Sequence, residues 1–208
     1  AENSPYYLTG AKFTYSPNSQ LELAALICNG WQIIQKSYGG YAPCFGTQIK
    51  FTKEAKYILN WSTFIGSIDT ASRSTMRYFN NFYFQSQKST HFGFTAGFDM
   101  GVQQRFHQSK EYDVWFSYVG IIRYSVNKNW ALAARGEYFQ DINLIIISAP
   151  SGEFKTSGVS LNVDYSPVEN IVCRIEARWL HDPENNFVRK NILVDDNVFI
   201  VSSIAASF

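Results

Sequence analysis

The stretch NWALAARGEYFQD, residues 129–141, alternates between two kinds of side chain. In an extended strand, alternate residues share a face. One face would be apolar with an aromatic ring at each end, and it comprises Trp130, Leu132, Ala134, Gly136 and Tyr138. The opposite face would carry Arg135 and Glu137 in mid-strand. In a soluble sandwich the apolar face packs on a core, so the question is which face of this strand meets water.

The composition is rich in rings and poor in charge. Aromatic residues make up 17% of the 208 residues and charged residues also 17%, where an average soluble domain has about 25% charged residues. The net charge of +1 argues against nucleic acid as a partner. No apolar run reaches the roughly 18 residues of a transmembrane helix. Composition leaves both a soluble all-β domain and a membrane barrel open.

The spacing of apolar residues has a period of two along almost the whole chain, which predicts strands and no long amphipathic helix. No linker or change of composition divides the chain, so residues 1–208 are expected to form a single domain. The eleven predicted strands span residues 6–16, 19–31, 43–53, 56–67, 75–87, 90–105, 112–126, 129–141, 156–166, 169–180 and 197–208.

The connections between these strands alternate in length. Short ones are 16–20, 53–56, 87–90, 127–129 and 166–170, and long ones lie near 32–42, 68–74, 106–111, 142–155 and 181–196. Such alternation is typical of bacterial outer-membrane barrels, which have tight periplasmic turns and longer extracellular loops. The pattern predicts an all-β, antiparallel up-and-down transmembrane β-barrel with about 10–12 strands in this chain. A signal peptide is expected to be absent from this chain, which begins AENSPYY.

Aromatic residues at the ends of the apolar faces predict two girdles at the lipid interface. One comprises Tyr15, Tyr124, Trp130 and Tyr165 at the short turns, and the other comprises Tyr138 and Trp179 towards the long loops. The apolar faces are therefore expected to contact outer-membrane lipids, and the charged faces to line a lumen.

The mid-strand charges on the opposite faces are the candidate lumen-lining residues. They are Arg77, Asp99, Arg123, Arg135, Glu137, Asp164, Arg174, Glu176 and Arg178. Two interpretations stay open: a mixed-sign wall that orients ions and small hydrophilic solutes, or a salt-bridge network that plugs a narrow barrel. A count of ten to twelve strands lies between filled and open barrels. The near balance of sign predicts weak ion selectivity.

The chain ends NVFIVSSIAASF, with Phe208 closing an alternating strand. This ending resembles the insertion signal of bacterial outer-membrane proteins, which implies the barrel-assembly machinery as a partner. Ser202, on the apolar side, departs from the usual pattern.

Several segments resemble the putative β-barrel porin-2, or OmpL-like, family of bacterial outer membranes. They are NGWQ (29–32), RYFNNFY (77–83), ALAARGEYFQD (131–141) and VSLNVDYSPVENIVCRIEARW (159–179). The resemblance implies a pore. Family members are usually longer at the N-terminus, and closed bacterial barrels have an even number of strands. Eleven strands therefore lead us to expect either a missed strand or a chain that is the C-terminal part of a longer barrel.

The three cysteines, Cys28, Cys44 and Cys173, lack the spacing of a zinc or thioredoxin motif. Cys28 and Cys44 flank a loop and share a face, so a bridge between them is compatible with the sequence, although buried thiols are the preferred interpretation. No cofactor, metal site or catalytic residue is predicted.

Two alternatives to a pore stay open. One is a plugged structural or surface-interaction barrel that acts through its loops at 32–42, 142–155 and 181–196. The other is an enzyme at the barrel rim that uses His181 and Asp182, for which Asp195 and Asp196 would have to supply a second acidic pair. The sequence carries no signature of a homo-oligomer interface, and the oligomeric state is left open.

Overall fold

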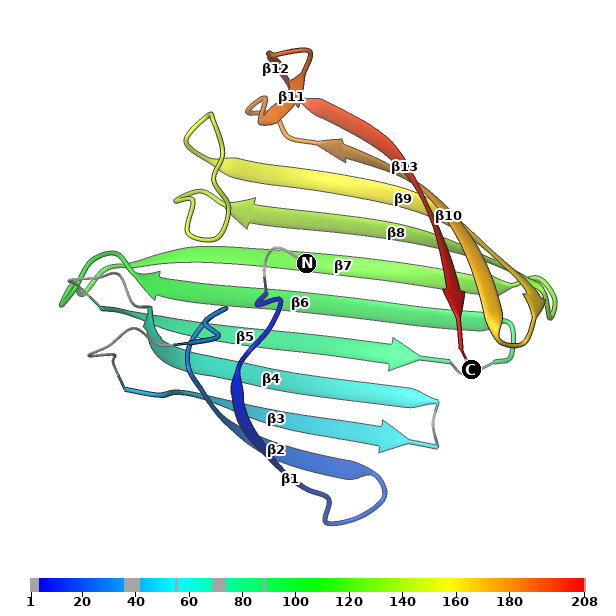
Figure 1. Cartoon of the computed structure of the whole chain (residues 1–208), viewed down its shortest axis with the longest axis horizontal. Helices are drawn as coiled ribbons and strands as arrows, with labels where there is room; N and C mark the ends of the chain where they lie inside the picture. Colours follow the sequence, from blue (N-terminus) through cyan, green and yellow to red (C-terminus); the bar gives the residue numbers. More distant parts are fainter. Residues whose placement is uncertain (1–3, 36–41, 55, 69–73, 88, 208) are drawn as a thin grey trace.

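The computed structural model describes residues 4–35, 42–54, 56–68, 74–87 and 89–207, and Phe208 lies outside them. Eleven strands form one antiparallel sheet in chain order (Figure 1). They are β1 (Gly10–Tyr15), β2 (Leu21–Cys28), β3 (Cys44–Lys53), β4 (Tyr57–Ile68), β5 (Thr75–Ser86), β6 (Phe92–Gln104), β7 (Tyr112–Ser125), β8 (Trp130–Asp141), β9 (Phe154–Val168), β10 (Ile171–His181) and β13 (Asp196–Ala206).

The predicted all-β, up-and-down antiparallel fold is confirmed, and each of the eleven predicted strands has its counterpart in the sheet. A small hairpin of β11 (Phe187–Arg189) and β12 (Ile192–Val194) was not predicted and lies in the connection before β13. In the described part of the chain, no helix is long and apolar enough to cross a membrane.

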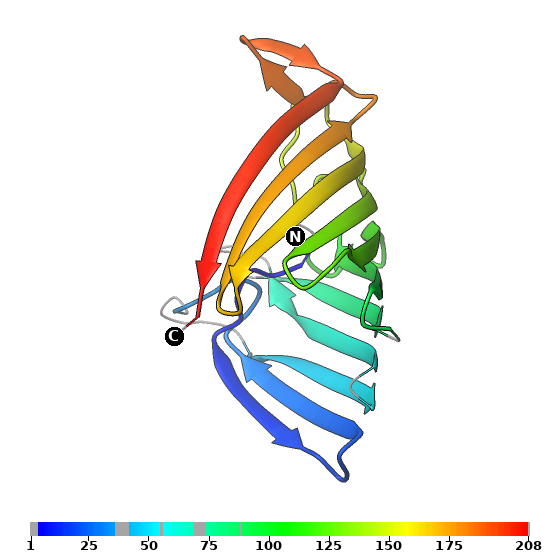
Figure 2. The ribbon, with the colours of Figure 1, turned by 90° about the vertical axis from the view of Figure 1, so that its right-hand side faces the viewer.

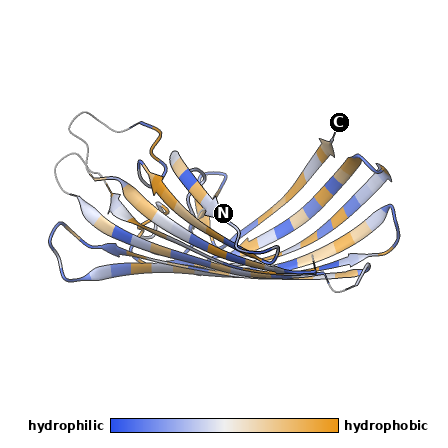
Figure 3. Cartoon of the chain, turned by 90° about the horizontal axis from the view of Figure 1, so that it is seen from below, coloured by the Kyte–Doolittle hydropathy of each residue, from blue (hydrophilic) through white to orange (hydrophobic). Residues whose placement is uncertain are grey.

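The sheet is strongly curved and open between its two edge strands, β1 and β13 (Figures 2 and 3). Because strand direction alternates along the eleven strands, β1 and β13 run in the same direction. The N-terminal segment lies inside the curve (Figure 3). One face of the sheet is therefore concave and the other convex.

Short turns gather at one end of the strands and long connections at the other (Figure 1). Side chains close the short turns. The Asn18 side-chain oxygen accepts hydrogen bonds from the backbone N–H groups of Gln20 and Leu21, both at 2.9 Å. Asn127 does the same for Asn129 and Trp130, at 2.9 and 3.0 Å. Asn favours such turns because its short side chain bonds to nearby backbone groups.

The convex face is apolar and exposed. Leu161 is 70% exposed and Ile204 77%. The accessible surface of 13316 Å² exceeds the value of about 9,900 Å² expected for a compact soluble protein of this mass. A single curved sheet with an uncovered apolar face explains the excess, because no second layer of structure covers that face in the described residues.

Polar side chains on the convex face bond to one another. The hydroxyls of Thr47 and Thr63, directly opposite on β3 and β4, lie 2.8 Å apart. Trp61 donates its indole N–H to Asn80 at 3.1 Å. In lipid, polar groups need internal partners because no water is present to bond them. The convex face, which includes the apolar face of residues 129–141, therefore has the properties of a lipid-facing surface.

Candidate functional site on the concave face

A network of amide side chains crosses the concave face of the first half of the sheet, and we call it the amide ladder. It runs from Lys12 on β1 through Gln48, Asn60 and Asn81 to Asp99 on β6. Successive donor–acceptor distances are 2.8, 2.7, 3.3 and 2.6 Å. Gln48 donates to Asn60, which donates in turn to Asn81. The ladder brings Asp99, a predicted lumen residue, together with neutral groups that the sequence analysis did not single out.

A first charged group joins β7, β9 and β10. Arg174 donates to the Asp164 carboxylate through Nε at 2.7 Å and Nη2 at 2.9 Å. Arg123 approaches the same carboxylate at 3.9 Å. The Asp164 side chain is 7% exposed, whereas about half of each arginine side chain is exposed. One largely buried acid thus holds two cations at the surface of the concave wall.

A second charged group joins β8 and β10. The Glu137 carboxylate accepts hydrogen bonds from both Arg135 and Arg178. Gly158, on the intervening strand β9, makes room for it, because a Cβ there would lie 2.7 Å from a Glu137 carboxylate oxygen. Glu176, two residues before Arg178, has concave parity and is half-buried. The structure thus brings together most of the charges predicted for the second half of the sheet.

Arg77 is placed differently from the other predicted lumen residues. It is 5% exposed, and its guanidinium lies over the rings of both Trp31 and Trp115, 4.8 and 5.2 Å from their centroids. Trp31 comes from the connection after β2 and meets Phe64 and Phe79 edge to face, at 5.3 and 5.2 Å between centroids. We call Trp31, Phe64, Phe79 and Trp115 the aromatic cluster. It covers Arg77 and removes it from the open concave surface.

The connection after β8 folds onto this cluster. The Asp141 carboxylate is fully buried and accepts backbone N–H bonds from Ile145, Ile146 and Ile147, at 2.9, 2.7 and 3.2 Å. Ile145 and Ile146 pack against the buried residues of the aromatic cluster. A single carboxylate therefore shapes the inward turn of this connection.

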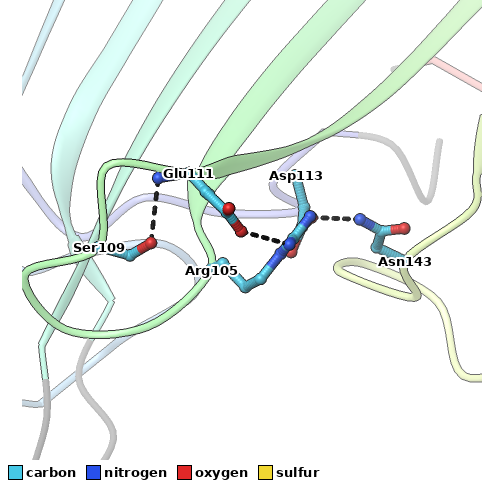
Figure 4. A network of polar contacts seen from close by, with 5 residues as sticks. All are labelled: Arg105, Ser109, Glu111, Asp113 and Asn143. Atoms are coloured by element: carbon cyan, nitrogen blue, oxygen red, sulfur yellow. Dashed lines mark hydrogen bonds and ion pairs between the residues drawn. The ribbon is translucent and has the colours of Figure 1, made fainter.

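A polar network at the long-connection end ties two loops together (Figure 4). Arg105 donates to Asp113 at 3.0 and 2.8 Å and to Glu111 at 2.5 Å. Asn143, in the connection after β8, donates to the same Asp113 carboxylate. The hydrogen bond to Asp113, with the nearby negative charges, raises the pKa of Arg105 above its ordinary value. Asp113, at the start of β7, thus ties the loop before β7 to the loop after β8.

A cavity of roughly 580 Å³ lies against the concave wall. It lies between the amide ladder and the second charged group, and its polar lining includes Asn81, Asp99, Arg135, Glu137 and Arg178. Ser4, in the N-terminal segment, also lines it. The cavity wall offers hydrogen-bond donors and acceptors and charges of both signs, which suits hydrated ions and hydroxylated solutes.

The six predicted girdle residues share the convex face. Five are exposed, and Tyr138 is half-buried against Tyr118, with 5.3 Å between ring centroids. At the short-turn end, Trp130 and Tyr165 are cross-strand partners with centroids 4.5 Å apart. Their position in a membrane interface stays a prediction. The predicted insertion signal, Phe208, lies outside the described residues.

The side chains of His181 and Asp182 lie in different surroundings. Asp182 is fully buried and accepts hydrogen bonds from the Thr156 hydroxyl at 3.0 Å and the Lys155 and Glu184 backbone N–H groups at 3.2 and 2.9 Å. His181 instead pairs with Asp196 on the neighbouring strand, 2.9 Å away. Asp182 therefore has a structural environment, which does not favour the rim-enzyme alternative.

One group of potential metal ligands occurs among the described residues. The ligand atoms of His181, Asp195 and Asp196 lie within 4.8 Å of one another at the rim. These residues belong to the rim-enzyme alternative, and the sequence predicts no metal site there.

Comparisons with known proteins agree with this architecture. A family model described as Putative beta-barrel porin-2, OmpL-like, matches residues 1–208. Among solved structures, "NanC porin structure in rhombohedral crystal form" aligns with a TM-score of 0.54 and 10% identity, covering 95% of this chain and 91% of that chain. At this identity the likeness concerns the fold alone. A search of curated proteins finds no match.

Proposed function

We propose a passive outer-membrane pore for ions and small hydrophilic solutes, on the premise that the chain belongs to the Putative beta-barrel porin-2, OmpL-like family. Membership of a porin family implies that the protein lies in the outer membrane. The pore, its lining and its solutes are the proposal.

The observation that carries the proposal is the contrast between the two faces of one sheet. The convex face exposes large apolar side chains, as at Leu161 and Ile204. The concave face carries the amide ladder and two charged groups, and Asn81 and Asp99 of the ladder and the second charged group line a cavity there. Both faces have a suitable solvent when the convex face contacts lipid and the concave face contacts water.

A continuous lumen requires the sheet to close, and we propose that residues 1–208 are the C-terminal part of a longer barrel. Because β1 and β13 run in the same direction, pairing them with each other would be parallel. Closure with antiparallel pairs alone needs an odd number of further strands between them. The total would then be even, as in bacterial single-chain barrels.

The charge balance of the proposed lining favours weak selectivity. With Arg77 covered by the aromatic cluster, the remaining predicted residues are four basic and four acidic. The basic ones are Arg123, Arg135, Arg174 and Arg178, and the acidic ones are Asp99, Glu137, Asp164 and Glu176. Pairing within the two charged groups holds these side chains against the wall. Neither sign dominates the field along the axis.

A plugged structural barrel is the second candidate, and one observation favours it. Trp31, Ile145 and Ile146 come from long connections and pack against the same buried cluster on the concave face. If they fill the closed lumen, the loops would carry the function. Buried Asp182 gives no support to a rim enzyme, and we propose that the protein is not an enzyme.

Solute uptake into liposomes separates the two candidates. Proteoliposomes holding the folded full-length protein would be placed in isosmotic solutions of neutral sugars of increasing mass. A pore predicts swelling with the smallest sugars and progressively slower swelling with larger ones. Swelling no faster than in protein-free liposomes for every sugar would support the plugged barrel. A gel-shift assay on the same sample verifies folding.

A further inference from the structure

Cys28 and Cys44 face each other across two strands. Cys28 ends β2, Cys44 begins β3, and the two are direct partners in the register of this pair. Both side chains are buried, at 3% and 1% exposure. Gly10, the partner of Cys28 on β1, and Gly66 on β4 occupy the same row. The two thiols are therefore flanked by residues without side chains.

The spacing of cross-strand partners suits a disulfide. Directly opposed residues of an antiparallel pair have Cα atoms about 4.5–5.5 Å apart. Disulfides span Cα separations of about 4.4–6.8 Å. The structure holds both residues as thiols, and the Cys44 Sγ lies 3.8 Å from the Ser67 carbonyl oxygen, above Gly66. Rotation of the Cys44 side chain to another staggered position is therefore needed to bring its sulfur towards Cys28.

We propose that Cys28 and Cys44 form a disulfide when the chain folds in an oxidising compartment. The oxidising compartment rests on the proposed outer-membrane location, because secreted chains meet such conditions in the periplasm. The oxidant is a small-molecule or protein disulfide. One cysteine thiolate attacks it and releases one thiolate, and the second cysteine attacks the mixed disulfide and releases the other. The two protons lost by the cysteines balance the two thiols formed.

The bridge would fasten both ends of the connection that carries Trp31. This residue covers Arg77 and contacts Phe64 and Phe79. Closing the connection by a covalent bond limits the conformations open to it before folding. The bridge therefore favours the placement of Trp31 over the aromatic cluster.

Thiol counting after refolding tests the bridge. The full chain would be refolded into detergent micelles in a mixture of reduced and oxidised glutathione, quenched with acid, denatured and alkylated, and its intact mass measured. We expect alkylation of one cysteine, Cys173, and a mass lower by two hydrogens than that of the reduced chain alkylated at the same site. The control Cys173→Ser should show no alkylation, and Cys28→Ser should show two alkylated cysteines.

Alkylation of all three wild-type cysteines, or glutathione adducts without an internal bridge, would overturn the proposal. Both outcomes are read on wild-type protein, so they do not depend on how a variant folds. Since this refolding is done outside cells, failure of the pore or of the location leaves the thiol count unaffected. The same count on protein from isolated outer membranes should give the same result if both proposals hold.

Discussion

Arg174 and Asp164, directly opposite on β10 and β9, form a two-point ion pair with distances of 2.7 and 2.9 Å. Two parallel hydrogen bonds fix the plane of the guanidinium as well as its position. The pair holds Arg174 along the concave wall, while Arg123 approaches the Asp164 Oδ2 oxygen, which also accepts from the Arg174 Nη2, at 3.9 Å. In the proposed lumen, charges held in this way would leave the centre open.

Removing one charge from this group should change ion selectivity in a direction set by its sign. In Arg174→Ala the lining loses a positive charge, and the reversal potential in a salt gradient should move towards that of a cation-selective channel. Asp164→Asn, the matched variant, should move it the opposite way. Shifts in the same direction for both would show that these residues do not face the conducting path.

Leu132 and Ala133 test the assignment of the two faces. Leu132 lies on the convex face, and Ala133, the next residue, lies on the concave face. Leu132 is two residues from Trp130, so Leu132→Arg should cost an amount between about 0–1 kcal/mol at the interface and about 2–4 kcal/mol at the middle of the membrane. Ala133→Arg should fold almost as well as wild type, because its charge reaches the polar side. Folding into lipid vesicles, followed by gel shift under urea, measures both, and equal loss in the two variants would contradict the assignment.

Gly101 makes room for the indole of Trp115. A Cβ at residue 101 would lie 1.9 Å from the Trp115 ring, whereas one at Gly120 would meet no atom within 4 Å. Gly101→Ala should destabilise the protein by about 1–3 kcal/mol through overpacking. Gly120→Ala is the control and should leave stability nearly unchanged. Urea unfolding followed by tryptophan fluorescence distinguishes them, and an unaltered midpoint in Gly101→Ala would show that Trp115 does not pack there.

Asp141 should control the inward turn of the connection after β8. Asp141→Ala leaves three backbone N–H groups without their acceptor, at a cost of about 1–3 kcal/mol for the buried groups. The connection should then be cut faster by thermolysin, which cleaves beside Leu and Ile residues such as those at 144–147. Asp182→Ala provides a comparison at another buried acid. An unchanged cleavage rate at 144–147 in Asp141→Ala would contradict the assigned role.

The strands and their faces follow from the sequence because each depends on a local pattern. Alternation in the stretch 129–141 fixes which side chains share a face, and the register pairs Leu132 with Val163 as two apolar residues on the convex side. Alternating connection lengths similarly predict which strand ends lie together. These features depend on neighbours in the chain, so they are readable without a structure.

Other features depend on contacts between distant segments and could not be predicted. Arg77 has the parity of a lumen residue, yet Trp31 from another connection buries it. The amide ladder passed unnoticed because Gln48, Asn60 and Asn81 carry no charge, although their alternation with apolar residues was a usable signal. The hairpin β11–β12 was missed because its strands are only three residues long.

Single-channel recording in a planar lipid bilayer is the most direct test of the proposed pore. The protein would be folded at full length, verified by gel shift, and recorded in symmetrical salt and then in a salt gradient. A weakly selective pore should give discrete steps of small conductance, proportional to bulk conductivity between low and moderate salt, with a reversal potential near zero. Absence of steps from verified folded protein, or a reversal potential near that of a perfectly selective channel, would contradict it.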